Sequence, residues 1–138
     1  MQLDFWTRFK EYATSRKSSL RLRKVYPQHW YDVSIGNSKS NLTLIVDADN
    51  DQIRCEFYIP DSKALFNALL SKKETIESKL PYELEWMELE GKKASRIRTL
   101  HTIDLSSIES WDTAFQWLME TSENFQTVFA EQMKKMKI

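Results

Sequence analysis

Apolar side chains near the start of the chain recur at the spacing of an α-helix. Phe5, Phe9 and Tyr12 fall on one face, because side chains three and four positions apart lie on the same side of a helix. Asp4 is placed to cap the first turn, since its carboxylate can accept hydrogen bonds from the free N–H groups there. We therefore expect an amphipathic helix over residues 4–14.

A longer helical stripe occupies the end of the chain. Its apolar members are Trp111, Phe115, Leu118, Phe125, Phe129 and Met136. Their spacings are three, four or sums of these, which predicts one long helix. Ser106 and Glu109 have the spacing of a capping box at its start. Further apolar residues lie off the stripe, at Trp117, Met119 and Val128, and leave room for a contact with a second copy of the chain.

Three segments in the first half of the chain alternate between apolar and polar residues. Their apolar positions are Tyr31, Val33 and Ile35, then Leu42, Leu44 and Val46, and then Ile53, Cys55, Phe57 and Ile59. Polar turns at residues 36–39 and 49–51 separate the segments. Such alternation is typical of antiparallel strands with one covered face, so we expect a three-stranded meander.

Helical spacing returns after Pro60. The apolar stripe consists of Leu65, Phe66, Leu69, Leu70, Ile76 and Leu80. It predicts a single helix over residues 62–79, and Pro81 ends it because proline lacks the N–H that the helix needs.

A second hairpin follows this helix. Apolar and acidic residues alternate over residues 83–86, and a return strand is expected over residues 94–102. A turn centred on residues 91–92 would place Glu85 near Arg98, where opposite charges on neighbouring strands attract.

These elements define an α+β fold in the order α-β-β-β-α-β-β-α. The simplest packing is a five-stranded, largely antiparallel sheet with the helices on one face. The length of 138 residues fits one domain, and we expect residues 1–138 to form it.

Composition narrows the class of protein. The 41% hydrophobic content excludes general disorder, and the balance of 20 basic against 20 acidic residues favours neither nucleic acid nor an acidic membrane. The lone cysteine, Cys55, excludes an internal disulfide and fits a reducing compartment. No apolar run approaches the roughly 20 residues of a membrane span, and we expect no secretory signal at the start of the chain. We expect a cytoplasmic protein without a membrane contact.

One short pattern resembles a catalytic motif. Asp61 follows a proline, and Glu90 and Lys92 stand further on, as in the metal site of restriction-endonuclease-like nucleases. In those enzymes the acids project from adjacent strands, whereas here a helix is predicted between them. Asp61 is more simply explained as the helix N-cap. A nuclease remains an alternative, but we expect no catalytic residue.

The histidines and the cysteine indicate no metal site. His29 and His101 are too few to form a metal cage with one cysteine, so no metal and no cofactor are expected. Cys55 has the inward parity of its strand, which predicts core packing. His29 beside Trp30 is the more interesting position for a contact.

Two basic clusters could contact phosphate. They consist of Arg16, Lys17, Arg21, Arg23 and Lys24, and of Lys92, Lys93, Arg96 and Arg98. If the first cluster folded over the second hairpin, the two would form one phosphate-binding surface, with Trp30 or Tyr31 stacking on a base. The alternative is that these charges pair with the acidic residues of the neighbouring strand.

The order and spacing of many residues resemble a bacterial domain-of-unknown-function family (DUF family 4268). The resemblance rests on Phe5-Trp6, Phe9-Lys10-Glu11-Tyr12, Pro27-Gln28-His29-Trp30, Ser34-Ile35-Gly36, Ile76-Glu77, Leu84, Trp86, Gly91-Lys92-Lys93-Ala94-Ser95-Arg96-Ile97, Trp111, Trp117-Leu118, Phe125 and Val128-Phe129. It implies an accessory domain that often follows a restriction-endonuclease-like domain in bacterial proteins with DNA-related or defence roles. We expect this chain to supply the accessory part without the nuclease part.

The expected function is therefore a non-catalytic accessory domain that contacts nucleic acid or a protein partner such as a nuclease subunit. The alternatives are a metal-dependent nuclease and a dimerising protein-interaction scaffold with an exposed apolar patch on the last helix or at a sheet edge. Within the family pattern, the candidate binding residues are Arg21, His29, Trp30, Ser34, Lys92, Lys93 and Arg96.

Overall fold

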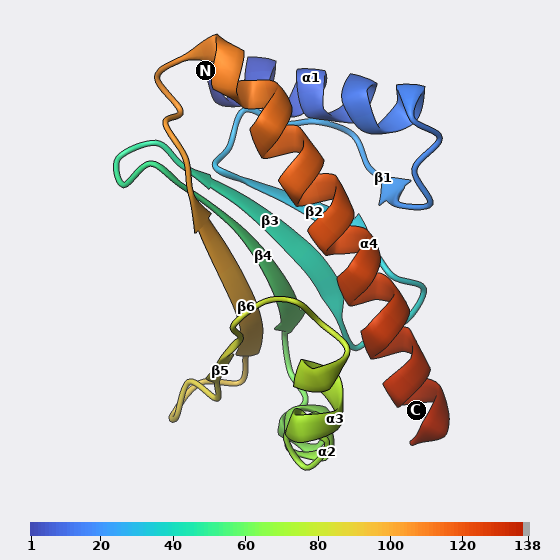
Figure 1. Cartoon of the computed structure of the whole chain (residues 1–138). Helices are drawn as coiled ribbons and strands as arrows, with labels where there is room; N and C mark the ends of the chain where they lie inside the picture. The colour runs from blue at the N-terminus through green and yellow to red at the C-terminus, as the bar shows by residue number, and fades with distance from the viewer. Residues whose placement is uncertain (137–138) are drawn as a thin grey trace.

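The structure, a computed structural model, describes residues 1–136. Its helices are α1 (Gln2–Ser15), α2 (Lys63–Leu70), α3 (Lys73–Ser78), the 3₁₀ turn η1 (Ile108–Ser110) and α4 (Trp111–Lys135). Its strands are β1 (Arg21–Leu22), β2 (Trp30–Ser34), β3 (Asn41–Asp47), β4 (Gln52–Ile59), β5 (Glu85–Met87) and β6 (Ser95–Thr102). The predicted α+β class is confirmed (Figure 1).

All strands belong to one antiparallel sheet in the order β1-β2-β3-β4-β6-β5. In the described part of the chain the sheet has six strands, so the predicted number of five was wrong. The additional strand is β1, in which Arg21 lies opposite Ser34 and Leu22 lies opposite Val33. Two residues are too few to show alternation along the sequence, and only the pairing with β2 makes them a strand.

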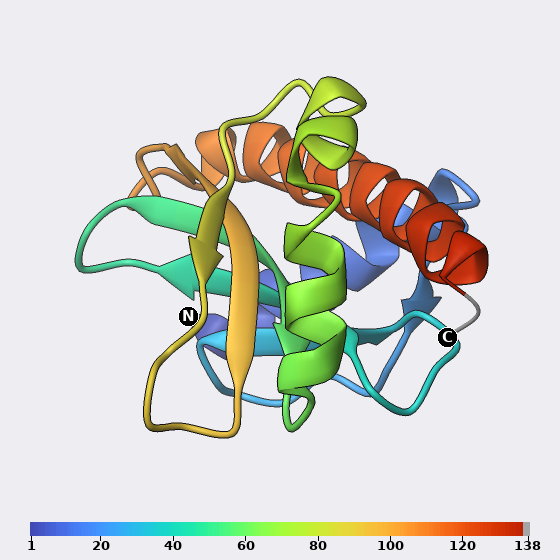
Figure 2. The same ribbon diagram turned by 90° about the horizontal axis from the view of Figure 1, so that it is seen from below.

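One face of the sheet carries the hydrophobic core. α4 lies across this face (Figures 1 and 2), and Phe129 of α4 stacks on Phe57 of β4 with 4.3 Å between ring centroids. α1 packs beside α4, and its Trp6 stacks on Tyr31 of β2 at 5.5 Å. The predicted apolar stripes of both helices are confirmed. Their buried members are Phe5, Phe9, Trp111, Phe115, Leu118, Phe125 and Phe129, while Tyr12 and Met136 pack half-buried against the core.

The helix predicted over residues 62–79 is two helices, α2 and α3. At the break, the hydroxyl of Ser71 donates to the carbonyl of Ala68 at 2.6 Å. The next N–H, of Lys72, reaches the carbonyl of Leu69 at 2.9 Å, which closes a tighter turn than an α-helix. Serine bonds of this kind compete with the helical ladder, which explains the interruption. Leu70, predicted in the apolar stripe, is consequently exposed.

The predicted helix caps were also wrong in detail. Ser62, not Asp61, caps α2, and its side chain accepts the N–H of Leu65 at 3.1 Å. The capping box before the last helix does not form, because the hydroxyl of Ser106 donates to Asp104 at 2.6 Å and the chain enters α4 through η1. The predicted N-cap Asp4 lies inside the first turn of α1.

Within residues 1–136 the other face of the sheet carries no packed helix, and we call it the open face. The inward-facing apolar side chains of β2, β3 and β4, and Ile97 of β6, belong to the core cluster with the helices. Ile45 of β3 has the opposite parity and lies outside that cluster, although neighbouring side chains bury it. The open face is therefore formed mainly by strand side chains and is bounded by the loops at the ends of the sheet.

Candidate interaction surface

A row of charged and polar side chains crosses the middle of the open face. By strand register it runs through Asp32, Thr43, Glu56, Arg98 and Glu85, one residue from each of five strands. Because directly opposite residues of an antiparallel pair project to the same side of the sheet, these five side chains form a continuous line.

Glu56 is the centre of this row and is unusual for an outward-facing acid, since its side chain is only 1% exposed. Its carboxylate pairs with the guanidinium groups of Arg96 and of Arg98, the latter at 3.5 Å. Arg98 continues to Glu85 at 3.6 Å. A buried carboxylate is costly unless it is paired, so the two arginines account for its place in the sheet.

The charges of the open face balance. Its cations are Arg21, Arg54, Arg96 and Arg98, and its anions are Asp32, Asp47, Glu56 and Glu85. Arg54 pairs with Asp47 at 2.5 Å. A side-chain hydrogen bond from Asn50, supported by the charge of Arg54, lowers the pKa of Asp47. The strand side chains of this face therefore include four arginines but carry no net charge.

A hollow of about 330 Å³ opens beside the charged row. It is lined by His29, Trp30, Asp32, Thr43, Ile45, Tyr58 and Arg96. Trp30 is 37% exposed and meets the ring of His29 edge-on at 4.8 Å. The guanidinium of Arg96 lies over the ring of Tyr58, 4.5 Å from its centroid. Aromatic walls with an arginine and an aspartate at the rim can hold an apolar or planar side chain and bond to its polar end.

The predicted binding residues lie in three places. His29, Trp30 and Arg96 come together at this hollow. Arg21 and Ser34 lie opposite each other where β1 pairs with β2, on the same face. Lys92 and Lys93 are exposed in the loop of residues 88–94 between β5 and β6.

The two basic clusters do not form one surface. The first belongs to the segment around β1, which pairs with β2 at one edge of the sheet, and the second belongs to β6 and its preceding loop. Four strand spacings of about 4.8 Å separate β1 from β6. Tyr31, considered as a stacking residue, is buried under α1, and its hydroxyl donates to the carbonyl of Arg23 at 2.5 Å.

The nuclease motif does not assemble a metal centre. Ile59 pairs with Ser95, so Asp61 and the loop that holds Glu90 and Lys92 lie at the same end of the sheet, contrary to the separation we expected from the intervening helix. The ammonium of Lys63 occupies this end and contacts the carbonyls of Glu88, Leu89 and Ala94. Within residues 1–136, no group of three or more acids, histidines or cysteines could hold a metal ion.

Cys55 and His101 are the remaining polar candidates, and both contact side chains of α4. Cys55 is fully buried as predicted, with its sulfur 3.7 Å from the hydroxyl of Ser122, and burial raises the pKa of its thiol to about 12. His101 lies near the end of β6 and stacks on Trp117 at 5.6 Å.

The sequence did not single out Glu56, Tyr58 or Ile45. The parity of β4 and β3 places all three outward, but an outward glutamate between strand residues usually meets solvent. The burial of Glu56 depends on β6 lying next to β4, and no local sequence pattern indicates that these two strands are neighbours.

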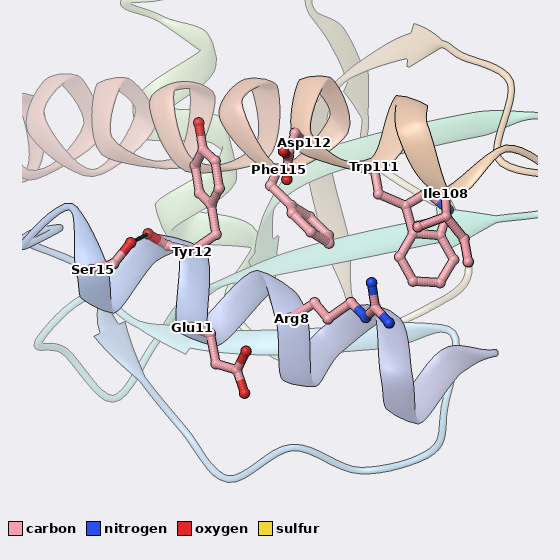
Figure 3. Close-up of a pocket in the computed structure, with 8 residues that line it drawn as sticks. All are labelled: Arg8, Glu11, Tyr12, Ser15, Ile108, Trp111, Asp112 and Phe115. Carbon is pink, nitrogen blue, oxygen red and sulfur yellow. Dashed lines mark hydrogen bonds between the residues drawn. The ribbon is translucent and has the colours of Figure 1, made fainter.

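A second hollow, of about 440 Å³, lies between α1 and the start of α4 (Figure 3). Figure 3 shows Arg8 pointing toward Trp111 while Glu11 points away from it. Arg8 is already bonded to Asp4 at 3.1 Å, and Trp111 bonds through its indole N–H to the carbonyl of Leu105 at 3.1 Å. Arg8 and Trp111 thus have partners in the fold, so this hollow is the weaker candidate. No helix in the described part of the chain is long and apolar enough to cross a membrane.

Among solved structures, this fold is similar to that of YbjN, a proposed transcription regulator from E. coli, with a TM-score of 0.58 and 6% sequence identity over 95% of this chain and 92% of that chain. A looser similarity, with a TM-score of 0.44 and 12% identity over 94% of this chain and 96% of that chain, is to the ExsC–ExsE complex. The first similarity concerns the fold alone, and the second is too low to support an argument. No curated protein sequence matches the chain.

The family model for a domain of unknown function (DUF4268) matches residues 1–133. That range runs from α1 to the last turns of α4 and includes every residue of the open face. The chain therefore belongs to the DUF4268 family.

Proposed function

We propose that this domain binds a protein partner through the open face of its sheet. The observation that carries the proposal is the hollow where Trp30, Tyr58 and Arg96 meet beside a charge-balanced row. Tryptophan, tyrosine and arginine are the residues that contribute most to protein–protein affinity, above all when they surround a pocket.

The pairing of the arginines with carboxylates favours a protein partner over a nucleic-acid partner. Arg54, Arg96 and Arg98 are each paired with a carboxylate of the same face. A phosphate would have to displace those carboxylates, and affinity for nucleic acid comes from cations that are free to neutralise phosphates. A protein partner needs no such exchange, because it can bury the aromatic rings and bond to the rim.

Photo-cross-linking in the producing cells tests the proposal. With benzoylphenylalanine in place of the exposed Trp30, we expect irradiation to yield an adduct with one protein. The additional substitution Arg96→Ala should reduce the adduct at least about tenfold, because loss of an interface arginine of this kind costs about 2 kcal/mol.

Thr127 provides the matched control position, since it is exposed on α4, away from the open face. The same cross-linker there should give no such adduct. An adduct that disappears on nuclease treatment, or equal adducts at the two positions, would contradict a protein partner on the open face.

A nucleic-acid contact is the second candidate, and one observation favours it. Lys92 and Lys93 are exposed and form no salt bridge within the described residues. Two free cations on a loop at the rim of the open face could contact a phosphate backbone. The predicted association with a nuclease subunit and the predicted homodimer remain hypotheses about which partner the face meets.

A further inference from the structure

Among the residues that the structure describes, half of β6 has no neighbouring strand on its outer side. β5 pairs only with residues 96–98 of β6, whereas β4 pairs with β6 as far as Thr102. Residues 99–102 thus form the edge of the sheet beyond β5, and in Figure 1 no strand lies there on the side of β6 opposite β4. Leu100 on this edge is 38% exposed.

The direction of the backbone groups follows from one hydrogen bond. The N–H of Ile103 donates to the carbonyl of Asp51 at 2.9 Å, on the β4 side. Because the N–H and C=O of one strand residue point the same way and alternate from residue to residue, those of Thr99 and His101 also point to β4. The N–H and C=O groups of Leu100 and Thr102 point outward to the free edge.

The segment before β5 is held away from this edge. The hydroxyl of Tyr82 accepts a hydrogen bond from the side-chain amide of Asn124 on α4 at 2.9 Å, and its ring packs on Trp117 at 6.3 Å. The chain between Pro81 and β5 therefore follows α4 and does not extend the pairing with β6.

A hollow of about 610 Å³ lies between that segment and the free edge. Its walls include Tyr82, Leu100, His101 and Trp117, and its rim carries the acids Glu83 and Glu85. Glu85 is paired with Arg98, but Glu83 has no salt bridge within residues 1–136. The edge thus combines free strand hydrogen-bonding groups, an aromatic hollow and an unpaired negative charge.

We propose that the free edge of β6 over residues 99–102 accepts an extended segment of a partner protein as an additional strand in line with β5. The outward groups of Leu100 and Thr102 bond to its backbone, as in other strand additions at sheet edges. An apolar side chain of the segment enters the hollow, and a lysine or arginine meets Glu83.

A second copy of this chain fits the edge less well. Antiparallel pairing of two β6 edges about His101 would bring Asp104 of one copy opposite Arg98 of the other, where Glu85 already lies. The pairing could not extend past Thr102, and it would add an acid to an acidic rim. A basic extended segment has neither conflict.

This inference rests on the proposed function, since it names a second protein contact, but it can fail separately. The cross-link at Trp30 reports on the open face, whereas amide hydrogen exchange in the free chain reports on the edge. We expect the amides of Leu100 and Thr102 to exchange at least about tenfold faster than those of Thr99 and His101, because only the latter bond to β4. Equal protection of all four would overturn the free edge.

A labelled ten-residue peptide that alternates isoleucine with lysine and threonine serves as the probe. We expect binding by fluorescence anisotropy, slowed exchange at Leu100 and Thr102, and at least about tenfold weaker binding when the peptide lysines become glutamates or its backbone is N-methylated. In the chain, Thr102→Pro should abolish binding because it removes an outward N–H, while Thr102→Val should retain it.

The N-methylated peptide keeps the test meaningful if Thr102→Pro does not fold, since it needs only the unaltered chain. No binding at millimolar peptide, or undiminished binding after N-methylation, would overturn the proposal. So would a concentration-dependent dimer in sedimentation that protects the Leu100 and Thr102 amides, because the edge would then belong to a second copy.

Discussion

At the scale of single residues, burial decides the chemistry of the two ionisable side chains at the centre of β4. Cys55 points into the core and is fully buried without a charged partner, whereas Glu56 points to the open face and is buried among arginines. Neighbouring residues of one strand thus hold a buried thiol in the core and a buried carboxylate that pairs with two arginines on the other face.

Because the thiol of Cys55 is buried, we expect the protein to lose stability at alkaline pH. An unfolded cysteine ionises near 9, while burial raises the pKa of Cys55 to about 12. Its contribution to the free energy of unfolding is therefore complete below pH 9 and falls as the pH rises toward 12, by about 1.4 kcal/mol per unit. Urea unfolding at pH 8 and pH 10 should show this loss, and the Cys55→Val variant should show a smaller one.

Because Glu56 is buried, we expect the charged row to contribute to the free energy of unfolding. In Glu56→Gln the arginines lose their central anion, and we expect the free energy of unfolding to fall by about 2 kcal/mol. Glu85→Gln is the control, because the Glu85 side chain is 51% exposed and its pair with Arg98 contributes less than about 1 kcal/mol. Equal losses in the two variants, measured by chemical denaturation, would show that the burial of Glu56 has no special role.

At the scale of elements, α4 organises the core. It packs on β3 and β4, on α1 and on α3, and its buried residues continue from Trp111 to Met133. Trp117 and Met119, which we considered as an exposed contact for a second copy, are half-buried against the core, and Val128 is buried. The last helix therefore offers no exposed apolar patch, and a dimer through it has no support in the described structure.

The inner face of α4 can be tested by truncation. Phe129 is completely buried and stacks on Phe57, so Phe129→Ala should reduce the free energy of unfolding by about 3–5 kcal/mol. Thr127→Ala on the exposed face of the same helix should change it by less than about 0.5 kcal/mol. Thermal and urea unfolding of both variants provide the comparison.

At the scale of the whole molecule, zero net charge and paired arginines oppose binding to nucleic acid. We expect no affinity tighter than about 10⁻⁴ M for a 20-base-pair DNA duplex at physiological salt, since nonspecific binding depends on free cations. Fluorescence titrations at several salt concentrations measure this affinity. Micromolar binding that weakens steeply with salt and disappears on combined replacement of Lys92, Lys93 and Arg96 by alanine would instead support the nucleic-acid candidate.

The amino-acid pattern determined which side chains face the core and how neighbouring segments pair. The inward positions of β2, β3 and β4, the stripes of α1 and α4, and the placement of Glu85 opposite Arg98 all follow from local alternation and turn length. These features involve residues close together in the sequence, so the periodicity of the elements is sufficient to predict them.

Only the tertiary structure decided which strands lie side by side. Placing β6 next to β4 encloses Glu56 between arginines that follow it by some 40 residues in the chain, and placing β1 beside β2 keeps the two basic clusters apart. The same packing, with Tyr82 held on α4, leaves half of β6 without a neighbour. The physical reason is that strand order is selected by the combined burial of distant segments against α4, and local periodicity carries no information about which segments those are.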